Sequence, residues 1–155
     1  MADLRRLKHI KHFAYDTTVP PIIHDSDIKK LLSWWPNLEY FELGSVPQEE
    51  GGLLPPLHMT MTALSTFAAK APKLQKLLLP LAVYGVEGET NGISSIADPT
   101  SPLRSLTVVQ LETSNPSDLA AYLHRLFPAL RNLDGPYDGG EAWTETRAAL
   151  LALAS

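Results

Sequence analysis

The chain has 155 residues, a length that suits one domain and leaves a core large enough to fold without disulfides. Hydrophobic residues make up 45% and charged residues 19%, which excludes a disordered chain, and the absence of Cys excludes disulfides, thiol nucleophiles and thiolate zinc sites. The net charge of -4 at pH 7 opposes general attraction to nucleic acid or to anionic membrane, so we expect neither as a partner.

The N-terminal residues are basic. Arg5, Arg6, Lys8 and Lys11 make this stretch too charged for a secretory signal, and no apolar stretch approaches the length of a membrane span. We interpret the cluster as a solvated flank of the first structural unit. We therefore expect a soluble protein of the cytoplasm or nucleus.

Three segments share one layout, which is an apolar stripe at helical spacing, a proline, and then a strand-like L-x-x-L-x-L run. The three stripes with the strand residues that follow them are Ile28, Leu31, Leu32 and Trp35 before Leu38, Phe41 and Leu43; Met61, Leu64, Phe67 and Ala71 before Leu74, Leu77 and Leu79; and Leu119, Tyr122, Leu123 and Leu126 before Leu130 and Leu133. Spacing of i, i+3, i+4, i+7 places each stripe on one helix face, and alternation places the strand residues on one strand face.

Two partial copies extend the array. They are Ile10, Phe13 and Tyr15 near the N-terminus, and Leu103, Leu106 and Val108 after Pro102. Strands would then start at 10, 38, 74, 103 and 130, with most separations near the range of roughly 20–29 residues that is typical of leucine-rich repeats. The sequence predicts an α/β leucine-rich-repeat solenoid of about five repeats, with parallel strands on the concave face and helices on the convex face.

The ends of the helices are also predicted. Proline cannot continue a helix, so Pro36, Pro72 and Pro128 should stop each helix just before the next strand. Asp25 or Ser26 can cap the first helix, and Asn115 the last full one. A closing helix at about 141–154, with Trp143, Leu150 and Leu151, should cover the last repeat, which makes residues 1–155 one domain.

The turns between helix and strand carry a family resemblance. The units Trp35-Pro36-Asn37-Leu38 and Phe127-Pro128-Ala129-Leu130, each following a short helix, resemble the irregular leucine-rich repeats of fungal F-box-like proteins over nearly the whole chain. In that family the repeats receive a protein substrate, and an F-box couples it to a ubiquitin ligase. The resemblance implies a protein partner, either a substrate or a ubiquitin-ligase component.

Residues that alternate with the buried leucines should point to the concave surface. These are His12, Ala14, Asp16, Tyr40, Glu42, Lys76, Leu78, Ser105, Thr107, Val109, Asn132 and Asp134. Their mixture of aromatic, apolar and charged groups suits a protein partner better than a polyphosphate, which would require many cations.

Long connections leave the carboxyl ends of the predicted strands, whereas the turns from helix to strand are short. All the long connections should therefore emerge on one rim, where insertions in repeat proteins often serve binding. We expect the rim residues Tyr84, Glu87 and Tyr137 to extend the concave site, together with Leu53, Leu54 and Glu89.

No residue set predicts catalysis, a metal site or a cofactor. His9 and His12 have a spacing that is common by chance, and the glycine-rich stretch around Gly88 matches no phosphate-binding motif. We therefore expect a protein-protein interaction module and not an enzyme. Two alternatives stay open: a small enzyme that uses His24, His58, Glu89 or Asp98 in the rim loops, and a structural fragment that associates with itself through the exposed end of the first repeat.

Overall fold

The structure, a computed structural model, describes residues 2–15, 22–43, 61–83, 101–111, 115–134 and 140–154. In chain order its elements are the 3-10 helix η1 (Ala2–Arg6), β1 (His12–Tyr15), α1 (Asp25–Trp34), β2 (Tyr40–Leu43), α2 (Thr62–Lys70), β3 (Lys76–Val83), β4 (Ser105–Leu111), α3 (Pro116–Leu126), β5 (Asn132–Asp134) and α4 (Gly140–Ala154). The predicted closing helix at about 141–154 corresponds to α4.

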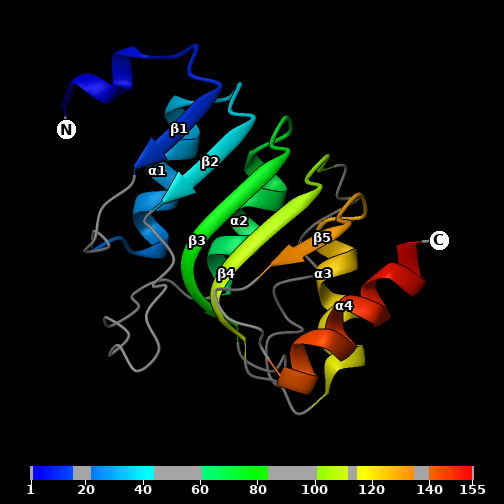
Figure 1. The fold of residues 1–155 in the computed structure, drawn as a ribbon. Coiled ribbons are helices and arrows are strands. Elements are labelled where there is room, and N and C mark those ends of the chain that lie inside the picture. The colour runs from blue at the N-terminus through cyan, green and yellow to red at the C-terminus, as the bar shows by residue number, and fades with distance from the viewer. Residues whose placement is uncertain are drawn as a thin grey trace.

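The five strands form one sheet in which every neighbouring pair is parallel and the strand order equals the sequence order, β1-β2-β3-β4-β5. Helices α1, α2 and α3 all lie on one face of this sheet (Figure 1). Helix α4 packs along α3, at the end of the sheet where β5 lies. Successive helices also contact one another, α1 with α2 and α2 with α3. The predicted α/β fold, with one parallel sheet alternating with helices, is confirmed.

The core lies between the sheet and the helices. Phe13, Phe41, Leu77, Leu106 and Leu133 are partners in register on the five strands, and all but Phe13 are buried. The row begins with aromatic contact, since the rings of Phe13 and Phe41 stack with centroids 5.3 Å apart.

Each predicted helical stripe faces this core. In α2 and α3 every stripe residue is buried, and in α1 only Leu31 is partly exposed. The ring of Phe41 lies 5.3 Å from that of Phe67, which ties β2 to α2. The sequence pattern therefore predicted the buried faces of α1, α2 and α3 correctly.

The strands begin two residues later than predicted. Leu38, Leu74 and Leu130 belong to the turns, where the backbone N–H of each donates to the carbonyl of the residue three positions earlier, at 3.0 to 3.3 Å. All three are nevertheless buried. The first leucine of each L-x-x-L-x-L run thus anchors the turn, and only the second and third lie on the strand.

Two apolar residues that were expected to face inward are exposed. Tyr15 is 48% exposed, because β1 is the edge strand and has a neighbour on one side only. Leu151 is 50% exposed while the adjacent Leu150 is buried, since consecutive residues of a helix point about 100° apart.

The helix caps were predicted in part. Asn115 caps α3, and its Oδ1 accepts a hydrogen bond from the backbone N–H of Asp118 at 3.3 Å. The prediction of Asp25 or Ser26 for α1 was wrong, because both lie inside the helix and His24 holds the capping position. The backbone N–H of His24 donates to the Asp27 carboxylate at 3.0 Å. Asp27, in the first turn of α1, therefore satisfies the backbone donor of the capping residue.

Candidate functional site

The face of the sheet opposite to the helices carries two rows of side chains, which we call the open face. The first row is His12, Tyr40, Lys76, Ser105 and Asn132, and the second is Ala14, Glu42, Leu78, Thr107 and Asp134. The members of each row are backbone partners in register across all five strands. None of these ten side chains is buried, so the sequence prediction of which residues share this face is confirmed.

The first row contains an aromatic contact at its N-terminal end. The rings of His12 and Tyr40 lie 5.4 Å apart between centroids with their planes tilted by 45°. Tyr40 is 36% exposed, which leaves ring surface available for contact. An aromatic side chain that is half-covered by a neighbouring ring loses little conformational entropy when a partner binds it.

The second row is joined to the first by an ion pair. Lys76 Nζ lies 2.8 Å from Glu42 Oε1, and both side chains remain partly exposed. The pair connects β2 and β3 diagonally across the rows and lies beside Tyr40, the partner of Lys76 in register. Leu78 lies in the same row as Glu42, which places an apolar group next to the pair.

Some of the predicted binding residues lie outside the described residues. These are Asp16 on the predicted concave face, and Tyr84, Glu87, Tyr137, Leu53, Leu54 and Glu89 on the predicted rim. Val109 belongs to β4, but its side chain is also outside the description. The described part of the predicted site is therefore the open face.

The small-enzyme alternative involves four residues, most of which lie outside the described ranges. Of the four residues considered for a small enzyme, only His24 is described, while His58, Glu89 and Asp98 are not. In the ranges given above, no three His, Asp or Glu side chains come together as metal ligands would. None of the helices in those ranges is long and apolar enough to cross a membrane.

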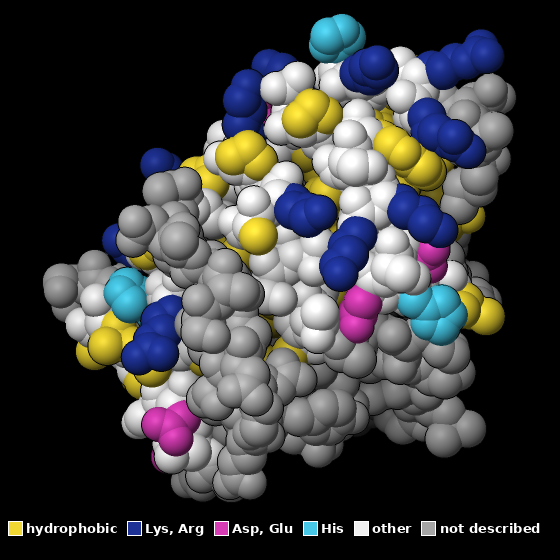
Figure 2. Space-filling view, turned by 180° about the vertical axis from the view of Figure 1, so that it is seen from behind, with side chains coloured by type: hydrophobic (Ala, Val, Ile, Leu, Met, Phe, Trp, Pro, Cys, Tyr) yellow, Lys and Arg dark blue, Asp and Glu magenta, His cyan; other side chains and the backbone are white. Residues whose placement is uncertain are grey.

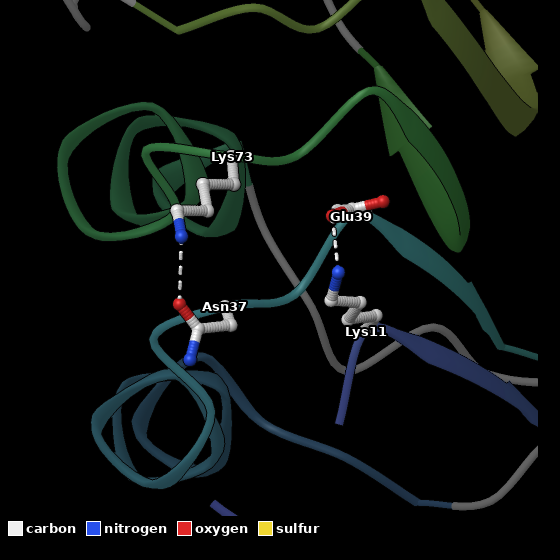
Figure 3. A network of polar contacts seen from close by, with 4 residues as sticks. All are labelled: Lys11, Asn37, Glu39 and Lys73. Atoms are coloured by element: carbon white, nitrogen blue, oxygen red, sulfur yellow. Dashed lines mark hydrogen bonds and ion pairs between the residues drawn. The ribbon is translucent and has the colours of Figure 1, made fainter. Parts of the chain in front are cut away.

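The edge where the strands begin carries cations that the sequence analysis did not group. At this edge Lys11 Nζ lies 3.6 Å from Glu39 Oε1, and Lys73 Nζ donates to Asn37 Oδ1 at 2.9 Å (Figure 3). Each contact joins the turns of two neighbouring strands. The signal in the sequence was the short turn before each predicted strand, because aligning the strands also aligns these turns.

Comparison with known proteins gives no relative for this chain: no protein-family model matches it, and no curated protein does.

Proposed function

We propose that the chain is a leucine-rich-repeat solenoid of about five repeats that binds a protein partner and has no catalytic role. Parallel sheets ordinarily have both faces covered by helices. Among the described elements the helices cover one face, and the strands alternate between buried and open residues. This pattern suits a solenoid in which one face of the sheet is kept for binding.

The observation that carries the proposal is the pair of rows on the open face. They combine an aromatic ring, an ion pair, an apolar side chain and neutral hydrogen-bonding groups in register. Protein interfaces are enriched in Tyr and combine an apolar centre with polar groups around it. A polyphosphate ligand would require a surface rich in cations, and Lys76 is the one cation among the ten residues.

The size of the open face indicates that the partner contacts more than the strands. Five strands spaced by about 4.8 Å and three residues deep present roughly 200–300 Å². A stable interface buries about 800 Å² on each partner. We therefore propose that the connections leaving the carboxyl ends of the strands, with Tyr84, Glu87 and Tyr137, complete the site.

The partner that we propose is a protein in the cytoplasm or nucleus, with no cofactor or metal at the site. The resemblance of the turns to those of fungal F-box-like proteins supports a substrate-receptor role, in which the partner is a protein to be ubiquitinated or a component of the ligase. An open, unenclosed surface also suits a macromolecule better than a small ligand, which prefers a concave pocket.

Affinity capture from the source cell, followed by quantitative mass spectrometry, tests the proposal. The variant Tyr40→Ala, Glu42→Ala, Lys76→Ala should lose the captured partner by about tenfold or more, since central interface residues dominate binding. The control Lys29→Ala, Lys30→Ala, Glu145→Ala changes three exposed helix residues and should retain it. Equal loss from both variants would contradict the proposal.

A further inference from the structure

The residues that directly precede the strands form a continuous ladder at one edge of the sheet. Backbone N–H groups donate from Glu39 to Lys11 at 2.7 Å, from Gln75 to Glu39 at 2.7 Å, from Arg104 to Gln75 at 2.9 Å, and from Arg131 to Arg104 at 3.0 Å. Five residues that are far apart in the sequence therefore occupy consecutive strands at the same level. The ladder also contains Gln75 and Glu39, and Glu39 forms an ion pair with Lys11. We call Lys11, Arg104 and Arg131, together with Lys73 from the turn before β3, the basic edge.

The charges of the chain are distributed unevenly along the sequence. The segments that leave the carboxyl ends of the strands, 16–24, 44–61, 84–100, 112–115 and 135–139, contain eight Asp or Glu and no Lys or Arg. The remaining residues contain all thirteen Lys and Arg and nine Asp or Glu. The net charge of -4 therefore conceals a basic part of the molecule. Figure 2 shows the helix side, where Lys and Arg visibly outnumber Asp and Glu over the described surface.

Favourable interaction with the negative ends of helices explains the positions of only some of these Lys and Arg residues. Lys70 and Arg125 lie in the last turns of α2 and α3, where a positive charge stabilises the helix. Lys11 and Arg104 precede β1 and β4, and neither of these strands follows a described α-helix. The guanidinium of Arg104 is exposed and has no ion pair among the described residues.

Two of the cations are held in position by the turns. Arg131 Nη1 donates to the carbonyls of Pro128 at 3.3 Å and Leu130 at 3.1 Å, and Lys73 Nζ donates to Asn37 Oδ1. A guanidinium has five N–H donors, so Arg131 keeps others for a ligand. Orientation by the turns lowers the entropy cost of binding an anionic group.

We propose that the basic edge binds an acidic, extended polypeptide segment that crosses the strands. The edge spans five strands, or about 19 Å, which equals about six residues of extended chain. Alternate residues of such a segment lie about 6.7 Å apart and present carboxylates on one side, toward the cations. Arg pairs with carboxylates through two parallel hydrogen bonds, which suits Arg104 and Arg131 on neighbouring strands.

The same edge fits a nucleic acid poorly. The turns 7–11, 36–39, 72–75, 101–104 and 128–131 contain no Phe, Tyr or Trp, so they offer no surface on which bases could stack. Helices α1, α2 and α3 also direct their C-terminal, negative ends toward this edge, and this repulsion grows with the charge density of a ligand. A nucleic acid carries a charge on every residue, whereas a peptide of alternating Glu and Ser carries one on every second residue. A peptide backbone also carries N–H donors, which a phosphodiester backbone lacks.

Fluorescence anisotropy with a labelled decapeptide of alternating Glu and Ser tests the inference. The peptide should bind the intact chain, and an otherwise identical peptide of Gln and Ser should not. Arg104→Glu should weaken binding by about tenfold or more, and Arg104→Gln by less, because reversal adds repulsion to the lost pair. Raising the salt from about 0.05 M to 0.3 M should weaken binding as well, since exposed charges are screened.

Arg147→Glu is the matched control, because it reverses an exposed Arg that lies on α4 and not in the turns that form the basic edge. It should change the affinity less than about twofold. Absence of binding to the Glu-Ser peptide, an equal loss with Arg147→Glu, or tighter and Arg104-dependent binding of a ten-nucleotide oligothymidine would each overturn the inference. The inference goes beyond the proposed function, and Tyr40→Ala on the open face should leave peptide binding intact.

Discussion

The two faces of the sheet differ in every strand although their residues alternate one by one. Phe41 is fully buried against Phe67 of α2, whereas Tyr40, one position earlier, is 36% exposed and its ring lies beside that of His12 on the open face. The inward row is uniformly apolar, and the outward row changes its chemistry at each strand. The inward row therefore supplies the buried core, and the outward row is the surface that we propose for binding.

The largest expected effect is at the centre of the inward row. Phe41→Ala should lower the free energy of unfolding by about 3–5 kcal/mol, because a large fully buried ring leaves a cavity. Tyr40→Ala should cost less than about 1 kcal/mol, since its ring is already partly in solvent. Urea denaturation of both variants measures the difference in the free energy of unfolding. Similar losses from the two variants would show that the outward row stabilises the fold as much as the inward row does.

A smaller effect is expected at the end of the inward row. Phe13 is only partly buried, because β1 is the edge strand. Phe13→Ala should therefore cost about 1–2 kcal/mol, roughly half of what full burial of the ring contributes. The same denaturation experiment checks this value, and a loss as large as that of Phe41→Ala would mean that Phe13 is covered more fully in solution.

The smallest effect is expected on the open face. A double-mutant cycle of Glu42→Ala and Lys76→Ala should give a coupling energy of about 0.2–1 kcal/mol, because both side chains are partly exposed and screened by solvent. Measured stabilities of the two single variants and the double variant provide the value. A coupling above about 2 kcal/mol would mean that the pair stabilises the fold and is not kept mainly for binding.

Much of the fold could be predicted from the sequence because the repeat is periodic. The spacing of Leu119, Tyr122, Leu123 and Leu126 predicted the buried face of α3, and the alternation of Leu77 and Leu79 predicted the inward face of β3. The open face followed from the same alternation. Periodicity reports which side of an element is buried, and this is the property that folding selects most strongly.

The exact strand starts and the basic edge could not be predicted in this way. Leu38 and Leu74 are as buried as strand residues, so their apolar character does not reveal that they lie in turns. Arg104 and Arg131 are separated in the sequence by α3 and become neighbours only through parallel pairing of β4 and β5. All five predicted strand starts were early by the same two residues, so the relative alignment of the strands was already correct. Apolar periodicity identifies buried residues, however, and it gives no reason to group exposed residues of the turns.

The order of the strands has a mechanical consequence. Because β1 and β5 are the two edges of the sheet and follow the sequence, the two ends of the chain lie at opposite ends of the molecule (Figure 1). Tension applied between the termini would act along the hydrogen bonds that join neighbouring strands, so these bonds would open one strand at a time and not all together. A chain anchored at both ends would therefore extend stepwise under low force, as a zipper does.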